Sequence, residues 1–478
     1  MDKRIVILGA GPTGLGAATR LHELGHRNWL LLEGASEPGG LASSVRDDNG
    51  FLWDMGGHVI FSHYKYFDDV ITTFVPDWLH HRREAYVWMC DRFIPYPLQN
   101  NIHRLPPLER ESCLQGLIDA QQQATPTPTP TKPATFQDWI DRNFGKGLAR
   151  LFLNPYNFKV WAYRPSAMTA DWVGERVAKV DVKRIVDNIA SNRDDVAWGP
   201  NSQFSFPENG GTGAIWRAVY DHLPADNCRL SSEVVRIYAD EKLVELRSGE
   251  TLAYDALVAT APLDSTLRLL SGSRLAAMKS LADIPVHSSS HIVGLGLRGQ
   301  PPAHVRGKCW LYFPEDDCPF YRATVFSHYS PNNVPQPGRQ WSLMMEVSES
   351  PEKPLAGDVV QATVDGATNT RLVPDPAHVV SRWHTRLEYG YPTPFVGRTK
   401  FLEAVQPQLE ELQIYSRGRF GGWKYEVSNQ DHSLMQGVEA VDAILLGGEE
   451  LTYHRPNVVN ANKEDLNTCR RFRPRYIC

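Results

Sequence analysis

The N-terminal stretch restricts the fold more than any other part of the chain. Residues 4–8, RIVIL, form a short β-branched run that leads directly into GAGPTGLGAATRLHELG at 9–25, where apolar residues recur at helical spacing and Gly25 stops the helix. A second apolar run at 29–32 ends at Glu33. A strand, a helix and a strand in this order predict a β-α-β unit.

The glycines of this unit are typical of a dinucleotide site. Gly9 supplies a tight turn, Gly11 a close backbone approach to a pyrophosphate, and Gly14 helix-on-strand packing, while the helix N-terminus offers free N–H groups to phosphates. Glu33 lies roughly 20 residues after the turn, where the carboxylate that holds an adenosine ribose is expected. The glycine pair of EPGGLASS (37–44) lets a second loop approach the cofactor. The sequence therefore predicts dinucleotide binding, and the glycines alone leave NAD and FAD open.

The charge balance and the cysteines limit the partners. A formal net charge of -5 leaves no basic face for nucleic acid or anionic lipid, so we expect neither a nucleic-acid nor a membrane partner. An anionic substrate would need arginines of its own. The seven cysteines lack C-x-x-C or other metal-ligand spacing, so we expect free thiols in a reducing compartment and no metal site.

Length and apolar runs bound the architecture and the location. The chain of 478 residues exceeds the size of about 250–300 residues at which single cores stop growing, which predicts two or three domains. Its first residues are not typical of a signal peptide, and no segment reaches the roughly 18 to 20 apolar residues of a spanning helix. We therefore expect a soluble protein in the cytoplasm.

The pattern of elements changes along the chain. Residues 135–200 carry apolar residues at i, i+3 and i+4 and predict helices. Residues 229–260 alternate in short runs broken by charged turns, which predicts a β-meander that ends on a buried strand. Further strand candidates between 288 and 347 predict an antiparallel sheet of its own.

Eight segments together resemble the eukaryotic type of UDP-galactopyranose mutase, a flavin-dependent family. They occur in the same order as in the family and span most of the chain. Several long matching segments are a stronger signal than any single motif. The segments are GGHVIFSHYKYFDDV (56–70), IPYPLQNNI (94–102), NPYNFKVWA (154–162), GERVA (174–178), FPENGGTGAIW (206–216), CWLYFPED (309–316), CPFYRATVFS (318–327) and GRFGGWKYEVSNQDHSLMQGVEAVD (418–442).

The resemblance implies an α/β fold with a discontinuous Rossmann-like FAD-binding domain, a helical-bundle domain and a twisted antiparallel β-sheet domain. We assign residues 1–88, 205–285 and 405–478 to the FAD domain, 103–204 to the helical bundle, and 89–102 with 286–404 to the sheet domain.

The family interconverts UDP-galactopyranose and UDP-galactofuranose without net oxidation, although its FAD must be reduced. In the family, N5 of the reduced flavin attacks the anomeric carbon and UDP leaves, and the resulting adduct opens and recloses as the five-membered ring. Eukaryotic members take the activating electrons from NADPH. The resemblance implies the same activity and cofactors here, while monomer and homo-oligomer stay open.

The substrate residues follow from the same resemblance. UDP is a dianionic leaving group, so two positioned guanidiniums would hold it and stabilise its departure. Arg176 and Arg322 match the family's two diphosphate-binding arginines, although Arg176 taken alone would be interpreted as a solvated helix residue. The other matched substrate residues are Tyr96, Gln99, Asn157, Trp161, Asn201, Tyr312, Tyr391, Tyr425 and Asn429.

Four of these matches have plainer alternatives. Tyr312, Tyr391 and Tyr425 could be buried residues bonded to the backbone, and Trp161 could be a core residue of the helical domain. Leu98 stands where fungal members carry phenylalanine, which leaves the packing around uracil open.

The flavin residues are matched in the same way. A helix starting near Gln430 would point its positive end at the flavin and favour the anionic reduced form. Arg83 matches an arginine linked to NADPH binding. The matched cofactor residues are Gly40, Leu41, Ser43, Gly56, Gly57, His58, Val234, Arg419, Gln430 and Ser433, beside the dinucleotide residues Gly9, Gly11, Gly14 and Glu33.

His58 is counted with Arg176 and Arg322 as a residue of the reaction centre. A lone histidine beside an apolar run is more often structural, but the resemblance places Gly56-Gly57-His58 against the reactive edge of the flavin. We expect His58 to set the loop conformation and tune flavin protonation rather than act as a general base. Phe61 should line the pocket, and His63 should be structural.

Three alternatives remain at this stage. An amine-oxidase-like or desaturase-like flavin enzyme would consume oxygen or another acceptor with its substrate. A non-enzymatic flavoprotein would have lost the two arginines or the Gly-Gly-His loop, which are intact. An NAD-dependent dehydrogenase would show a separate hydride-transfer motif, and none is recognisable.

Overall fold

A parallel sheet forms around the N-terminal strand. The computed structural model describes residues 3–123, 133–178, 180–196, 202–272, 275–461 and 470–473. The sheet has the order β20-β13-β1-β2-β9, and every neighbouring pair in it is parallel. Its strands are β1 (Ile5–Leu8), β2 (Trp29–Leu32), β9 (Cys228–Arg229), β13 (Ala256–Ala259) and β20 (Ile414–Ser416). The predicted β-α-β unit is confirmed as β1, α1 (Pro12–Leu24) and β2, with Gly25 as the left-handed C-cap.

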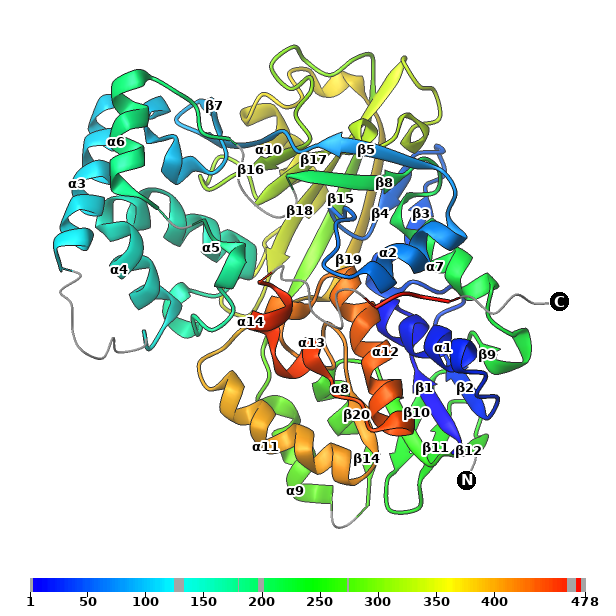
Figure 1. Ribbon diagram of the computed structural model, residues 1–478. Helices are drawn as coiled ribbons and strands as arrows, with labels where there is room; N and C mark the ends of the chain where they lie inside the picture. Colours follow the sequence, from blue (N-terminus) through cyan, green and yellow to red (C-terminus); the bar gives the residue numbers. More distant parts are fainter. Residues whose placement is uncertain are drawn as a thin grey trace.

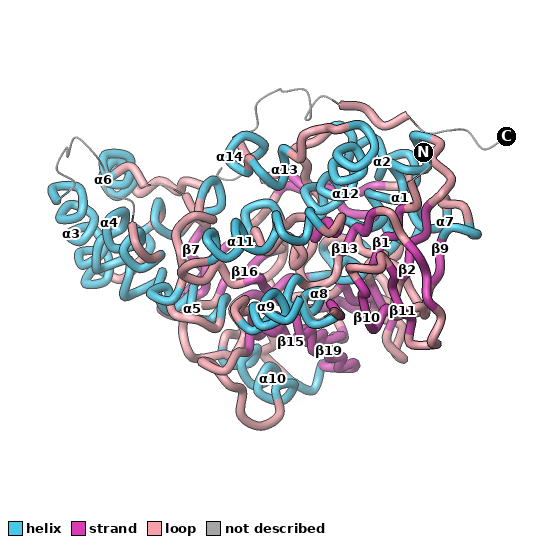
Figure 2. The backbone as a smooth tube through the Cα atoms, turned by 90° about the horizontal axis from the view of Figure 1, so that it is seen from below, coloured by secondary structure: helices cyan, strands magenta, loops and turns pink. Residues whose placement is uncertain are grey.

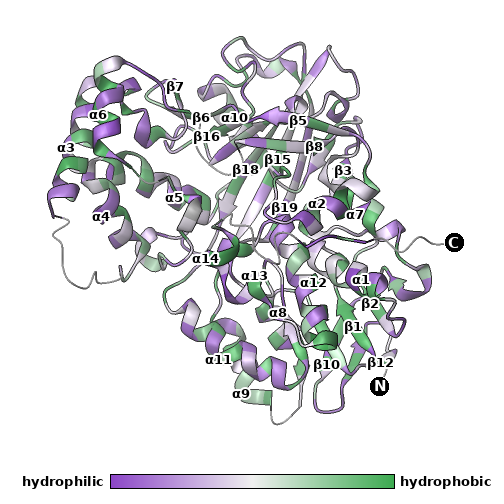
Figure 3. Ribbon diagram, viewed as in Figure 1, coloured by the Kyte–Doolittle hydropathy of each residue, from purple (hydrophilic) through white to green (hydrophobic). Residues whose placement is uncertain are grey.

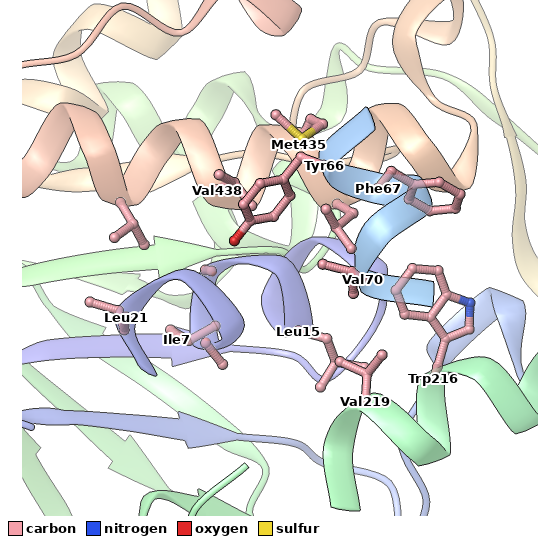
Figure 4. Packing of buried hydrophobic residues seen from close by; sticks show 14 of the residues in the cluster. Ile7, Leu15, Leu21, Tyr66, Phe67, Val70, Trp216, Val219, Met435 and Val438 are labelled. Atoms are coloured by element: carbon pink, nitrogen blue, oxygen red, sulfur yellow. The ribbon is translucent and has the colours of Figure 1, made fainter. Parts of the chain in front are cut away.

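The alternation of strand side chains divides this unit into two cores. Ile5 and Ile7 of β1 pack into one cluster, whereas Val6 and Leu8 face the other, because successive side chains of a strand point to opposite faces. Figure 3 shows β1 and β2 as hydrophobic ribbon, as strands covered on both faces must be. Figure 4 shows the first core, built from β1, α1, α2 (Lys65–Phe74), α7 (Gly211–Asp221) and α12 (Gln430–Leu446).

Two glycines allow α1 and α12 to cross closely over the sheet. A Cβ added at Gly16 would overlap the backbone of Leu434, and one added at Gly437 would overlap the carbonyl oxygen of Thr13. The close crossing brings the N-terminus of α12 beside the N-terminus of α1.

The second core lies under the predicted meander. β10, β11 and β12 pair antiparallel and β14 joins parallel to β10, while the buried β13 enters the parallel sheet, so the predicted meander that ends on a buried strand is confirmed. The elements of this layer are β10 (Val234–Tyr238), β11 (Leu243–Leu246), β12 (Thr251–Ala253), β14 (Leu270–Ser271), α8 (Leu263–Leu269), α9 (Ala276–Lys279) and α11 (Arg398–Glu411).

A seven-stranded sheet forms the second half of the molecule. Its order is β19-β15-β18-β17-β16-β6-β7, and all its pairs are antiparallel except β16 with β6. Its strands are β6 (Ala85–Met89), β7 (Arg92–Pro95), β15 (His287–Arg298), β16 (Trp310–Tyr312), β17 (Arg322–Val325), β18 (Gln340–Glu349) and β19 (Val379–Pro392), with α10 (Val359–Asn369) packed beside them. Two small ribbons complete the strands: β3 (Ser44–Arg46) with β4 (Leu52–Asp54), and β5 (Trp78–Arg82) with β8 (Gln203–Pro207).

A helical bundle lies beside the seven-stranded sheet, away from the parallel sheet, in both Figure 1 and Figure 2. Its helices are α3 (Pro107–Gln123), α4 (Phe136–Leu148), α5 (Asn154–Trp161) and α6 (Val182–Ser191), and α5 contacts β18. The helices predicted for residues 135–200 are confirmed at α4, α5 and α6, whereas the described residues between α5 and α6 form only short 3-10 helices and α3 lies before the predicted range. Two short helices, α13 (Leu451–His454) and α14 (Pro456–Val459), follow α12.

The assignment of residues to three domains stays a prediction. Three of its boundaries fall inside strands or α-helices: 88/89 divides β6, which pairs with both β7 and β16, 204/205 divides β8, and 404/405 divides α11. In the described residues no helix combines the length and the apolar character needed to cross a membrane. The five cysteines that the structure describes are free thiols.

Candidate functional site

A cavity of about 1080 Å³ lies where the parallel sheet, the seven-stranded sheet and the helical bundle meet. The carboxyl ends of β1 and β2 open into it at Leu8 and Leu32, and Gln430 and Ser433 of α12 face it. Ligands of open α/β sheets bind at this edge. All the predicted site residues line the cavity except Gly14, which lies outside it, and Asn201, which lies outside the described residues.

The glycine end of the cavity has room for a ligand backbone. Gly9 has φ 102°, which side-chain-bearing residues rarely adopt, and a Cβ there would overlap Thr260. Gly14 packs helix on strand, because its Cβ would overlap the carbonyl oxygen of Gly9. Gly11 precedes α1 without a side-chain cap, so the first N–H groups of that helix face the cavity.

Glu33 is anchored at the end of β2. Its Oε2 accepts from the N–H of Ala10 at 2.7 Å, and its Oε1 accepts from the N–H of Ala35 at 2.8 Å. A carboxylate has further lone pairs on both oxygens, so this fixed group can still accept from ribose hydroxyls. Val234, at the start of β10, lines the cavity next to it, as do Gly40, Leu41 and Ser43 of the adjacent loop.

The N-terminus of α12 is a second source of positive potential. Its N-cap, Asn429, makes no side-chain capping bond, so the helix end is open toward the cavity. Inside the protein, Asp431 in the first turn accepts from the backbone N–H of His63 at 3.1 Å and bonds its Nδ1 at 2.7 Å. His63 is buried behind the cavity, while Phe61 lines it.

The Gly56-Gly57-His58 loop enters the cavity from β4. Gly56 has φ 135°, the N–H of Gly57 donates to Oε1 of Glu346 at 2.9 Å, and the N–H of His58 donates to the Gly56 carbonyl at 2.8 Å. Burial lowers the pKa of His58 to about 4, so its ring is neutral near pH 7. Its Nδ1 has no partner among the described residues.

Arg322 reaches the cavity from β17, where Glu346 of β18 holds one edge of its guanidinium. Nε and Nη2 donate to the two carboxylate oxygens at 2.8 and 2.6 Å, and the guanidinium lies 5.0 Å from the ring centre of Trp310. Burial opposes the charged form, but the carboxylate of Glu346 outweighs it and raises the pKa of Arg322 well above its ordinary value. Nη1 makes no hydrogen bond to a described residue and remains for a ligand.

Arg176 is a second arginine that lines the cavity. Its Nη1 donates to Oδ1 of Asn429 at 3.3 Å, its Nη2 donates to the Glu426 carbonyl at 3.0 Å, and its guanidinium lies 4.7 Å from the ring centre of Tyr425. Two residues predicted separately as phosphate ligands, Arg176 and Asn429, are thus in direct contact.

Arg419 adds a third guanidinium. It donates to Oγ of Ser428 at 2.9 Å and to the Gly390 carbonyl at 3.0 Å, and it lies 5.0 Å from the ring centre of Tyr391. Burial lowers the pKa of Arg419, because it has no carboxylate partner among the described residues. An anionic ligand would relieve this charge.

Aromatic rings form the wall toward the helical bundle. Tyr312 contacts Tyr96 with ring centres 4.9 Å apart, and Trp161 contacts Tyr391 and Tyr425 at 5.5 and 4.8 Å. Gln99 donates to the Ala178 carbonyl at 3.2 Å and Asn157 to the Leu153 carbonyl at 2.7 Å, while both line the cavity. Leu98 lies in the core of the bundle, fully buried and outside the cavity. Arg83 stands 5.6 Å from the ring centre of Tyr96.

Several residues of the cavity wall were not among the predicted site residues. Tyr156, Trp310, Tyr321 and Glu346 all line the cavity. For Glu346 a signal was present, because a lone acid in the apolar run LMMEV (343–347) of a buried strand requires a partner. The aromatic residues gave none, since they are equally typical of a core.

The residues present fit a flavin dinucleotide. Two open helix N-termini and the anchored carboxylate of Glu33 suit a pyrophosphate and a ribose. Six buried polar atoms of the residues that line the cavity have no partner among the described residues and could be satisfied by a polar ligand: His58 Nδ1, Gln99 Oε1, Trp172 Nε1, Arg176 Nε, Ser290 Oγ and Trp310 Nε1.

Known proteins share this fold over nearly the whole chain. The model of the flavin containing amine oxidoreductase family matches residues 12–445. A crystal structure of a reduced UDP-galactopyranose mutase is similar with a TM-score of 0.92 at 50% sequence identity and covers 96% of this chain and 99% of that chain.

More distant structures are similar in fold alone. A putative protoporphyrinogen oxidase from Exiguobacterium sp. 255-15 has a TM-score of 0.70 at 17% identity and covers 94% of this chain and 99% of its own. Cyclohexylamine oxidase from Brevibacterium oxydans IH-35A has a TM-score of 0.64 at 17% identity, with 93% and 99% covered. The architecture is the α/β fold of flavin amine oxidases, as predicted.

Proposed function

Because the chain belongs to the flavin containing amine oxidoreductase family and shares half its sequence with a UDP-galactopyranose mutase, we propose that it is a UDP-galactopyranose mutase. It would interconvert UDP-galactopyranose and UDP-galactofuranose without net oxidation, as an isomerase that contains FAD. The long segments that match the eukaryotic type of the family support assigning the protein to that type.

The observation that carries this proposal is the charge of the cavity. Arg176, Arg322 and Arg419 all face it, and among the described residues only Arg322 has a carboxylate partner there. Two guanidiniums without a carboxylate partner, those of Arg176 and Arg419, favour a diphosphate near them over the cation that an amine oxidase must bind, although glutamates line other parts of the cavity. The aromatic wall of Tyr96, Trp161 and Tyr312 offers stacking surfaces for a base and a sugar.

The chain's own residues would prepare UDP for departure. Nη1 of Arg322 and the guanidinium of Arg176 are placed to donate to the diphosphate and to stabilise the charge that develops as it leaves. The tyrosine hydroxyls of residues 312, 391 and 425 add neutral donors. The flavin, when bound and reduced, supplies the nucleophilic chemistry at the anomeric carbon. His58 would hold the loop beside it with a neutral ring.

NADPH is the proposed reductant, and Arg83, at the cavity mouth beside Tyr96, is its proposed contact. We place the enzyme in the cytoplasm, where its nucleotide-sugar substrate and NADPH would both be available. These two assignments rest on the family resemblance.

The test is direct. The purified flavoprotein is incubated with UDP-galactofuranose, with and without dithionite, and the nucleotide sugars are separated by chromatography. We expect UDP-galactopyranose only from the reduced protein, and a reduced protein that forms none would refute the proposal.

A flavin amine oxidase is the second candidate, favoured by the family to which the chain belongs. It predicts oxygen consumption that depends on an added amine, measured with an oxygen electrode. The mutase predicts oxygen uptake only from uncoupled oxidation of the reduced flavin, independent of any amine.

A further inference from the structure

Glu346 lies where two predicted ligand sites touch. It stands in the middle of β18, is 3% exposed, and pairs in register with Arg322 of β17. A buried carboxylate is stable only with partners, and this one accepts from four donors in two separate segments of the chain, Gly57 and Tyr321-Arg322.

One of the two oxygens, Oε1, accepts a donor from each site. Oε1 accepts from the N–H of Gly57 at 2.9 Å and from Nε of Arg322 at 2.8 Å, and Oε2 accepts from Nη2 of Arg322 and the hydroxyl of Tyr321, both at 2.6 Å. Burial alone would raise the pKa of Glu346, but these donors outweigh it and hold the pKa below its ordinary value. The group is therefore an anion at neutral pH.

Gly57 rests directly on this pair. A Cβ at Gly57 would lie 3.0 Å from Oγ1 of Thr324, 3.1 Å from Oε1 of Glu346 and 3.5 Å from Nε of Arg322. Glycine is thus required for the close approach of the loop. Any movement of the Gly57 amide changes a hydrogen bond at the same oxygen that fixes Nε of Arg322.

We propose that Glu346 is a positioning residue that couples the Gly56-Gly57-His58 loop at the flavin to Arg322 at the diphosphate. The inference rests on the proposed function, because both ends are sites of that function. A change of loop conformation with flavin oxidation state alters the orientation of Arg322, and a bound diphosphate acts back on the loop. By linkage, UDP affinity and flavin potential must then depend on each other.

The test measures binding of UDP, not turnover. UDP dissociation constants are determined by titration for the FAD-loaded protein, oxidised and dithionite-reduced, and the flavin midpoint potential is measured with and without UDP. In the unchanged protein we expect the two dissociation constants to differ at least about fivefold, the lower range of allosteric coupling. The potential shifts by about 30 mV for each tenfold difference.

Glu346→Gln should weaken UDP binding at least tenfold and bring the ratio of the two constants close to one. Glu346→Asp keeps the charge but shortens the side chain, so it should lose the contact with Gly57, retain more UDP affinity and lose the ratio. If Glu346→Gln does not retain FAD, Glu346→Asp tests the role of Glu346. The control is Glu439→Gln, a buried acid of α12 that accepts from the N–H and the hydroxyl of Thr452 and lies outside the cavity, and it should keep the ratio.

The outcomes separate the two proposals. An unchanged protein that does not bind UDP refutes the proposed function and this role with it. UDP binding that is independent of oxidation state, or a ratio that persists in Glu346→Gln or Glu346→Asp, overturns only the role of Glu346. UDP binding with a ratio that Glu346 controls, in a protein that does not interconvert the sugars, supports the role and refutes the mutase.

Discussion

Arg398 and Glu426 form a buried, two-pronged ion pair behind the candidate substrate site. Nη1 and Nη2 of Arg398 each donate to one carboxylate oxygen of Glu426 at 2.8 Å. The carbonyl of Glu426 accepts from Arg176, and Tyr425 and Asn429 lie on the same short segment. The pair therefore fixes the backbone that carries one side of the site.

Breaking this pair should destabilise the protein and weaken UDP binding together. Arg398→Met leaves the Glu426 carboxylate buried without its partner, which costs about 3–5 kcal/mol. Urea unfolding measures the loss, and UDP titration measures the displacement of Tyr425 and Asn429. The control is Arg247→Ala, which breaks the exposed pair with Glu233 and should leave the stability nearly unchanged. Equal stability of Arg398→Met and the unchanged protein would contradict the role of the pair.

Removing Arg322 should separate substrate binding from cofactor binding. Arg322→Ala deletes the guanidinium whose Nη1 faces the cavity, so UDP affinity should fall by about 100-fold or more, as expected for a lost charge-assisted bond. The purified variant should still retain FAD, because Arg322 is not among the predicted cofactor residues and the other contacts of the dinucleotide site, such as Glu33 and the N-termini of α1 and α12, remain in place. Arg382→Ala, on the exposed side of β19, is the matched control and should bind UDP as before. Undiminished UDP binding by Arg322→Ala would remove Arg322 from the site.

The crossing of α1 and α12 should not tolerate a methyl group. Gly437→Ala places a Cβ onto the carbonyl oxygen of Thr13, and overpacking of this kind costs about 1–3 kcal/mol. Both helix N-termini would shift, so FAD retention should fall with stability. The measurements are urea unfolding and the ratio of flavin to protein absorbance. A stable variant with full flavin content would show that the helices can separate without harm.

Stability should decline as pH rises through the range in which Glu439 ionises. Burial raises the pKa of Glu439 from 4.5 to about 8, so the folded protein keeps this proton where the unfolded chain has lost it. The unfolded state then binds fewer protons between about pH 4.5 and 8, and the free energy of unfolding falls with pH across that window. Urea unfolding at pH 5 and pH 9 should show a smaller decline for Glu439→Gln than for the unchanged protein. Equal declines would assign the pH dependence to other groups.

His58 should act without gaining a proton. Its pKa of about 4 keeps the ring neutral from pH 5 to pH 8, so the rate of flavin reduction by NADPH should show no titration of His58 in that range. His58→Ala should retain FAD but change that rate and the turnover that follows it, because the loop loses its side-chain support. Stopped-flow absorbance of the flavin measures the rate. Normal reduction and normal turnover in His58→Ala would refute the assigned role.

Local patterns predicted the elements well. The glycines, the helical spacing and the short apolar runs gave β1, α1 and β2, because each depends on neighbouring residues only. The same reasoning gave the bundle helices and the meander. It did not reveal that the predicted boundary at 88/89 divides β6, because one partner of β6, the strand β16, lies far along the chain, although the other, β7, follows it directly.

The candidate site was predicted in composition more than in arrangement. The matched sequence segments identified the arginines, tyrosines and glycines that line the cavity, but they gave no reason to expect a contact between Gly57 and Arg322. Glu346 forms that connection, and it lies in none of the matched segments.

By itself the sequence determined the dinucleotide unit, the order of the elements and the residue types of the site, since these depend on short-range periodicity and on matched segments. Only the tertiary structure decided which charges meet. The register of the consecutive strands β17 and β18 places Arg322 opposite Glu346, and folding brings Gly57, from a loop far away along the chain, to the same carboxylate. A buried carboxylate needs hydrogen-bond donors, and these can come from any segment that folding brings next to it. The order of residues along the chain does not reveal which segments those are.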